Sequence, residues 1–301
     1  MAAPASSGIP EHIEHRITTP DGRTLAVAEW GDPGGVPVFF MHGDPGGRIS
    51  WPPDPTLDIR HGVRRLTFDR PGWGDSTRLA GRTVADVVAD VVTIADALGI
   101  GRFAVSGGSG GGPHALACAA LRPDRVLRCL CAVSPAPYGA EGLDWFAGMT
   151  EGNVTATHAA LEGERADRAL CERMAKTMLE RISAGQVNVL PDDYEVPESD
   201  LEQMRKHQFR IAAQLTHALA PGVDGWVDDD LAMVRPWGFS VADIRVPVWL
   251  QYGADDALVP RAHGEWLAAR IPGVRVSVLD AGHRDDSLLE QEWAWLAGKP
   301  G

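Results

Sequence analysis

FAVSGGSGGGPHAL, residues 103–116, is the stretch of sequence that decides the fold. A short apolar run enters a glycine-rich turn, and the turn leads into an alanine-rich helical segment that begins near Pro113. Residues 107–111 fit the pattern G-x-S-x-G, in which the central serine takes strained backbone angles at a sharp strand-to-helix bend and the glycines prevent Cβ clashes. We therefore predict that Ser109 is a nucleophile mounted at the end of a strand.

A glycine-rich turn between a strand and a helix can also bind phosphate, but the spacing argues against a phosphate site. Gly107 and Gly112 have the separation of the Walker A glycines, yet Pro113 stands where that motif needs its lysine. Pro113 or Ala115 also falls on the third position of G-x-G-x-x-G. A nucleotide site is therefore not expected, while a purely structural turn stays open on the motif alone.

Candidate partners for the serine lie downstream. A nucleophilic serine needs a base to accept its proton and an acid to orient that base. The apolar run VPVWLQYG ends in ADDALVP, which places Asp255 and Asp256 in a loop beyond a predicted strand. The alternating run at 274–279 leads into DAGH, which places His283 beyond another predicted strand. None of the other nine histidines follows a late strand, so His283 is the predicted base.

The order of serine turn, acid loop and histidine loop resembles the α/β-hydrolase superfamily, and the resemblance covers nearly the whole chain except about 137–240. The spacing of Gly253 and Pro260 around Asp256 matches the loop of the family's triad acid. This match selects Asp256 over Asp255, which would then be a solvated loop carboxylate.

The same resemblance implies an oxyanion hole made of two backbone N–H groups. One donor is Gly110, which follows the nucleophile, and the other is Asp44, in the loop HGDPGG at 42–47. His42 in this loop is expected to hydrogen-bond within the loop rather than to act as a second base. The Asp44 carboxylate would oppose the oxyanion unless it turns away or pairs with a cation such as Arg48.

The fold class that follows is α/β, a doubly wound and mostly parallel sheet with an inserted helical cap. Apolar residues recur at helical spacing after Thr83, which is expected to form a capping pair with Asp86. A strand-and-helix pattern lies on both sides of a helical stretch. We therefore expect one core, residues 1–136 and 241–301, interrupted by a cap at 137–240.

Within the cap, residues 154–183 and 199–219 have the pattern of amphipathic helices. Trp145, Trp226 and Trp237 are candidates for the wall of an apolar substrate pocket, although aromatic residues more often fill cores.

Composition narrows the ligands. The formal net charge of −13 repels phosphate backbones and anionic lipid heads, so we expect neither nucleic acid nor a membrane as partner, and instead a small-molecule substrate that is neutral, apolar or cationic. The N-terminus has neither a basic nor an apolar leader region, which favours a cytoplasmic protein. The four cysteines have no disulfide or zinc spacing, and neither a metal nor a cofactor is expected.

The resemblance implies a serine hydrolase that cleaves a carboxylic ester or lactone through an acyl-enzyme. One alternative is an aminopeptidase or amidase of the proline iminopeptidase type, whose members share the His-Gly-x-Pro-Gly loop and a Gly-Gly-Ser turn. Cap carboxylates such as Glu141, Asp144 and Glu151 could then hold a substrate ammonium, although Gly110 replaces the bulky residue usual in those enzymes. A second alternative is a ligand-binding protein that keeps the triad fold without hydrolysis.

Overall fold

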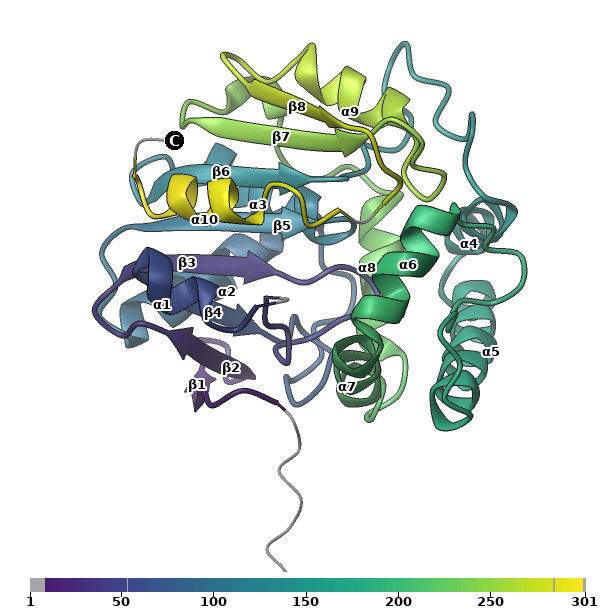
Figure 1. Cartoon of the computed structure of the whole chain (residues 1–301), viewed down its shortest axis with the longest axis horizontal. Coiled ribbons are helices and arrows are strands. Elements are labelled where there is room, and N and C mark those ends of the chain that lie inside the picture. The colour runs from purple at the N-terminus through teal and green to yellow at the C-terminus, as the bar shows by residue number, and fades with distance from the viewer. Residues whose placement is uncertain (1–8, 53, 284, 300–301) are drawn as a thin grey trace, which may run out of the picture.

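An eight-stranded sheet forms the centre of the molecule, in a computed structural model that describes residues 9–52, 54–283 and 285–299 (Figure 1). The strand order is β1-β2-β4-β3-β5-β6-β7-β8, and only the pairs β1/β2 and β2/β4 are antiparallel. The strands are β1 Ile13–Thr18, β2 Thr24–Gly31, β3 Val36–Met41, β4 Val63–Phe68, β5 Phe103–Gly108, β6 Val126–Ala132, β7 Val248–Gly253 and β8 Arg275–Leu279. The predicted mostly parallel sheet is confirmed.

Helices cover both faces of the sheet, which makes three layers. On one face, apolar residues of α2, α3 and α9 pack against the strands in the largest buried cluster, and on the other face α1 and α10 do so. The bounds are α1 Leu57–His61, α2 Val87–Ala97, α3 Gly111–Leu121, α9 Arg261–Ala268 and α10 Leu289–Leu296, with short 3₁₀ turns η1 Val84–Asp86 and η2 Val241–Asp243. The strands β3 and β5 are buried between both layers, as the continuous apolar runs in the sequence suggest.

The predicted capping pair of Thr83 and Asp86 forms at the start of the helical segment made of η1 and α2. The side chain of Thr83 accepts the N–H of Asp86, and the Asp86 carboxylate accepts the N–H of Thr83, 2.6 Å away. Gly99 closes the end of the segment with a positive φ of 67°.

Five helices lie between β6 and β7 in the chain, and we call them the cap. They are α4 Glu151–Glu162, α5 Glu164–Ser183, α6 Glu198–Lys206, α7 Gln208–Ala218 and α8 Asp224–Met233. Figure 1 shows them beside the ends of the parallel strands. Each of the two long helices predicted here is broken into two, at Gly163 with φ 110° and at His207. The apolar period continues across both breaks, so periodicity alone does not reveal them.

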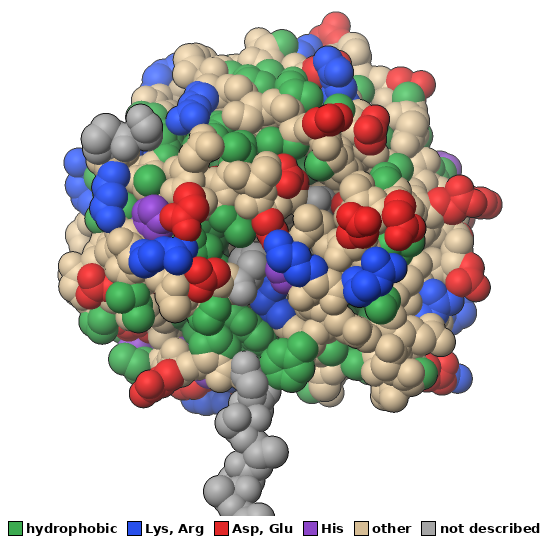
Figure 2. All heavy atoms as spheres, viewed as in Figure 1, with side chains coloured by type: hydrophobic (Ala, Val, Ile, Leu, Met, Phe, Trp, Pro, Cys, Tyr) green, Lys and Arg blue, Asp and Glu red, His purple; other side chains and the backbone are tan. Residues whose placement is uncertain are grey.

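Two further features of the molecule are the lengths of its apolar helices and the distribution of charge on its surface. In the part of the chain that the structure describes, no helix is both long and apolar enough to cross a bilayer. Acidic and basic side chains are interspersed across the face in Figure 2.

Candidate active site

Ser109 lies at the bend between β5 and α3 in a conformation that side chains rarely adopt. Its φ is +53°, and among the described non-glycine residues only Val133, at the end of the neighbouring strand β6, also has a positive φ. Such angles cost about 1–3 kcal/mol and persist only where the surroundings enforce them. The bend is tight, because a Cβ on Gly107 would lie 2.2 Å from the carbonyl oxygen of Gly111. The sequence pattern therefore predicts this bend correctly.

His283 and Asp256 meet beyond the ends of β8 and β7. The Nδ1 atom of His283 lies 2.8 Å from Oδ2 of Asp256, whose side chain is fully buried. The other carboxylate oxygen of Asp256 accepts the N–H groups of Leu258 and Val259, each at 2.9 Å. Asp255 is exposed to solvent. His283 is thus paired with Asp256, the acid that the sequence spacing selects. Both oxygens of this carboxylate have partners, which hold it in place.

A cavity of about 460 Å³ separates these residues from the cap. It is lined by Ser109, Gly110, Asp44 and His283. Four of the five residues that the sequence suggests for catalysis therefore share one cavity, and the fifth, Asp256, is buried behind His283. Apolar side chains of the cap, among them Met174, Met204 and Trp226, line part of the remaining wall. Among the described residues, Ser109 and His283 share the wall of this cavity without a hydrogen bond between their side chains.

The loop after β3 carries His42 as a structural residue. Its Nδ1 atom lies 2.8 Å from the carbonyl oxygen of Gly43, and its Nε2 atom accepts the N–H of Arg70 at 3.3 Å. Burial and the positive charge of Arg70 lower the pKa of His42 to about 3, which keeps the imidazole neutral. An imidazole that accepts through Nε2 donates through Nδ1, so His42 ties this loop together as expected.

The cation that pairs with Asp44 is Arg70, and the expectation of Arg48 was wrong. A guanidinium N–H of Arg70 donates to Oδ1 of Asp44, whereas Arg48 is engaged with Asp69, Glu14 and Asp75. The two arginines differ because Arg70 lies beneath the loop that carries Asp44 and also donates to the carbonyl oxygen of His42.

Arg70 does not keep the Asp44 carboxyl ionised. Burial and the negative charge of Asp229 outweigh the guanidinium and raise the pKa of Asp44 to about 8. The carboxyl group is therefore mostly protonated at neutral pH, and a neutral group beside the proposed oxyanion hole does not oppose negative charge there.

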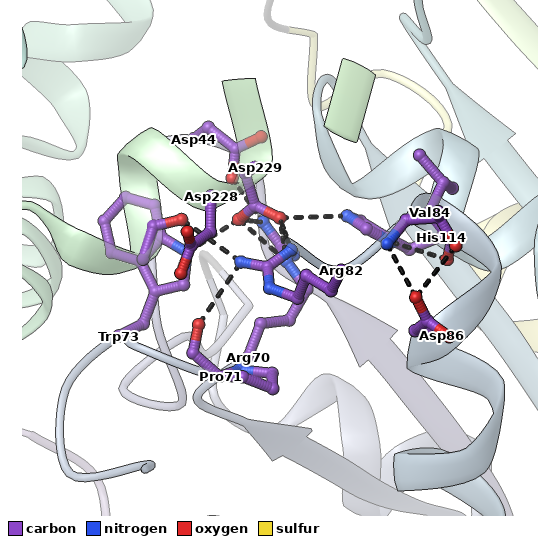
Figure 3. Close-up of polar contacts among 12 residues, drawn as sticks. Asp44, Arg70, Pro71, Trp73, Arg82, Val84, Asp86, His114, Asp228 and Asp229 are labelled. Atoms are coloured by element: carbon purple, nitrogen blue, oxygen red, sulfur yellow. Dashed lines mark hydrogen bonds and ion pairs between the residues drawn. The ribbon is translucent and has the colours of Figure 1, made fainter. Parts of the chain in front are cut away.

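Asp229 of α8 is the centre of a buried polar network that reaches this loop (Figure 3). Its carboxylate accepts from Arg70 at 2.9 Å and from Trp73 Nε1 at 2.6 Å, and it also accepts from Arg82. The Nε2 atom of His114 lies 3.3 Å away. Although burial alone would raise it, the two guanidinium groups lower the pKa of Asp229 well below its usual range. A cap residue thus anchors, through Arg70, the loop that carries Asp44.

The structure separates the three tryptophans that the sequence suggests for a pocket wall. Trp145 and Trp226 line the cavity, but Trp237 does not. Trp237 is buried in the main core, where its ring stacks on Phe239 and its carbonyl oxygen accepts the N–H of Ala85. In the sequence, Trp237 follows the last helix of the cap, and its side chain packs against the core and not against the cavity.

The cap carboxylates suggested from sequence are also wrong. Glu141, Asp144 and Glu151 are exposed, and none of them lines the cavity. The acidic cap residues that line it are instead Asp200 and Asp230. The sequence offers one sign of Asp230, the run of three aspartates at 228–230 in α8. Three successive carboxyl groups cannot all lie on one face of a helix, and a buried carboxyl group needs a partner.

The carboxyl group of Asp230 lies beside two more titratable groups. Ligand atoms of Asp230, Asp167 and Cys171 all lie within 4.8 Å of one another. Burial and the carboxyl groups of Asp167 and Asp44 raise the pKa of Asp230 well above its usual value, and burial raises the pKa of Asp167 to about 7. One oxygen of Asp167 has no hydrogen-bond partner among the described residues. Of these three groups, only Asp230 lines the cavity.

Comparisons with known proteins agree with this architecture. A family model described as alpha/beta hydrolase fold matches residues 36–285. A proline iminopeptidase of Neisseria meningitidis serogroup B is 28% identical over 282 residues, which cover 85% of each chain.

Two solved structures have the same fold over almost the whole chain. An esterase of Thermogutta terrifontis is 22% identical, with a TM-score of 0.63 over 95% of this chain and 96% of its own. An enol-lactonase of Burkholderia xenovorans is 20% identical, with a TM-score of 0.64 over 94% of this chain and 97% of its own.

Proposed function

The chain belongs to the alpha/beta hydrolase fold family, and from this premise we propose that it is a serine hydrolase that cleaves small-molecule carboxylic esters or lactones. The observation that carries the proposal is the 2.8 Å contact of His283 with buried Asp256 at the edge of the cavity that strained Ser109 also lines. A serine at such a bend, with an oriented imidazole on the same cavity, is equipped for acyl transfer.

The reaction begins when His283 takes the proton of Ser109 as the serine oxygen attacks the carbonyl carbon. Asp256 holds the imidazole in the tautomer that presents Nε2 to the serine and stabilises the imidazolium that forms. The tetrahedral oxyanion is stabilised by the backbone N–H groups of Gly110 and Asp44. Gly110 is the N-cap of α3, and the first N–H groups of a helix have no partner within the helix.

The imidazolium then gives its proton to the leaving alkoxide, and the acyl group stays on Ser109 as an ester. Water, deprotonated by His283, attacks this ester in turn, and the carboxylic acid leaves as the proton returns to the serine oxygen. In a lactone the leaving alkoxide stays attached to the acyl group, so the product is a hydroxy acid. Esters and lactones suit this site because alkoxide leaves more easily than amide.

The cavity supports a substrate with an apolar part. Apolar side chains of the cap, among them Met174, Met178 and Trp226, line it. Burying such a group is worth about 25 cal/mol per Å² of apolar surface.

The test is the intact mass of the protein after exposure to a small fluorophosphonate, with Ser109→Ala in parallel. This probe needs the nucleophile, the base and the oxyanion hole but no knowledge of the substrate. We expect a single adduct on the wild type and none on the variant. A folded wild type that takes no adduct would contradict the proposal and favour the ligand-binding alternative. If the wild type takes the adduct, its rates of hydrolysis of aryl esters and lactones then rank the substrates.

A second candidate is cleavage of an N-terminal residue, since the relative from Neisseria is named a proline iminopeptidase. Asp230 supports it, because its carboxyl group at the cavity wall offers a site for a substrate ammonium. Release of an aryl amine from a prolyl arylamide, with KM raised at least tenfold in Asp230→Asn, is the result expected of a peptidase. Equal KM values in the two proteins, or no release at all, favours the ester hydrolase.

A further inference from the structure

The loop that carries His283 is attached to the cap by one buried carboxylate. Oδ2 of Asp200, on α6, accepts the backbone N–H of His283 at 3.0 Å. Asp200 is only 2% exposed. A Cβ on Gly282 would lie 2.5 Å from the same oxygen, so the carboxylate is also in close contact with the residue before the histidine.

The same helix holds the far side of this loop. Nζ of Lys206 donates to Oδ2 of Asp286 at 2.7 Å, and Nε2 of His207 lies 2.7 Å from the same oxygen. Polar contacts therefore connect both the backbone of His283 and the side chain of Asp286 to this part of the cap, where Figure 1 shows α6.

Apolar residues of α6 attach it to the next helix of the cap. Leu201 and Met204 pack with Ile211 and Leu215 of α7 in a small apolar cluster. The helix is thus fixed to the cap by apolar contacts and to the histidine loop by polar ones.

We propose that Asp200 is a positioning residue, which holds the backbone of His283 so that its imidazole faces both Asp256 and the nucleophile. The inference rests on the proposed function, because it assigns His283 the role of base. The Asp256 contact fixes only one ring nitrogen, and a ring on a displaced backbone can keep that contact while its other nitrogen swings away from Ser109. A misplacement of about 1 Å in such a constellation costs about 100-fold in rate. Asp200 fixes the backbone end of the side chain, which Asp256 does not reach.

The experiment compares Asp200→Ala, Asp200→Asn and the matched control Glu202→Ala, an exposed acid on the same helix. For hydrolysis of an aryl ester we expect Asp200→Ala to lower kcat by about 10- to 100-fold with KM changed less than about threefold. Asp200→Asn keeps an oxygen that can accept the His283 N–H, so it should retain kcat within about threefold. Glu202→Ala should match the wild type.

A merely structural role of Asp200 would lower the melting temperature and leave kcat intact, and that result would overturn the inference. So would a loss confined to KM. The rate of fluorophosphonate labelling provides a second measurement: Asp200→Ala should label more slowly than the wild type, whereas Asp200→Asn and Glu202→Ala should label at nearly the wild-type rate. Equal labelling rates in Asp200→Ala and the wild type would contradict the proposal.

Two controls keep the result interpretable. Labelling of the wild type itself tests the proposed function, so a protein that never labels refutes that function rather than the role of Asp200. If Asp200→Ala does not fold, Asp286→Ala removes the second attachment of the same loop. We expect it to lower kcat at unchanged KM, and a kcat equal to that of the wild type would then overturn the inference.

Discussion

The carboxyl group of Asp44 lies directly over the α-carbon of Gly110. A Cβ on Gly110 would come within 1.9 Å of Oδ2 and 2.7 Å of Cγ of Asp44, which no side chain can tolerate without movement. The two residues proposed as oxyanion donors thus face each other across the start of α3, and the acid of one occupies the space that a side chain on the other would need. Glycine follows the nucleophile here because of this contact, since its φ of −55° is ordinary for any residue.

Gly110→Ala should displace the Asp44 carboxyl and with it the loop that carries the second donor. We expect kcat for an aryl ester to fall about 100-fold or more, the effect of losing one oxyanion donor. Asp44→Ala in the same chain removes the obstructing carboxyl and keeps the backbone N–H, so the double variant should recover much of the rate. Gly101→Ala is the control, because nothing lies within 4 Å of a Cβ there. A double variant as slow as Gly110→Ala would show that the contact is not the cause.

The pH profile should carry the signature of Asp44. With a pKa of about 8, its carboxyl gains a negative charge beside the proposed oxyanion hole as the pH rises above that value. We therefore expect kcat of the wild type to decline above about pH 8 and kcat of Asp44→Asn, which cannot ionise, to stay level over the same range. Steady-state rates between pH 6 and 10 check this, and parallel declines in the two proteins would rule it out.

The same group links stability to pH. Its pKa rises from 3.8 in the unfolded chain to about 8 in the folded protein, so the folded state keeps a proton that the unfolded chain releases. Its contribution to the free energy of unfolding is complete below about pH 4 and is lost as the pH rises through 8. Relative to the wild type, Asp44→Asn should therefore become progressively more stable between pH 5 and 9. Urea midpoints at several pH values measure the difference, and a constant difference would contradict the assignment.

Asp229 should matter more for stability than other acids on α8. Asp229→Asn leaves the buried guanidinium groups of Arg70 and Arg82 without their carboxylate, a change that typically costs about 3–5 kcal/mol. Asp224→Asn on the same helix breaks only exposed ion pairs, worth about 0–1 kcal/mol. Urea unfolding of both variants provides the comparison. Similar small losses in the two would mean that the network of Figure 3 is not a stabilising centre.

The two neighbouring aspartates after β7 should differ sharply in their effect on catalysis. Asp256→Asn removes the carboxylate at 2.8 Å from His283 and should lower kcat by about 10⁴-fold, as expected when the imidazole loses its tautomer. Asp255→Asn changes an exposed side chain and should leave kcat within about twofold. Ester turnover at pH 7.5 measures both, and equal losses would mean that the two acids share the task.

Local features of this chain were readable from the sequence because neighbouring residues determine them. The strained turn at Ser109 is enforced by glycines on both sides, the partners of the capping pair, Thr83 and Asp86, are three positions apart, and Asp256 is marked by its spacing from Gly253 and Pro260. The sheet follows from apolar runs and glycine turns in the same way. Each of these is a short-range pattern, which steric and hydrogen-bonding rules convert directly into structure.

Only the tertiary structure decided which distant side chains meet. Asp200 reaches the backbone of His283 across 83 positions, and Asp229 reaches Arg70 across 159. No local period records such pairs, because the fold of the cap over the strand ends brings them together. For that reason Arg70 rather than Arg48 pairs with Asp44. The sequence does not show whether the side chain of an aspartate or an arginine is buried or solvated. Only a buried pair of this kind holds a loop in place, because buried charges must be paired.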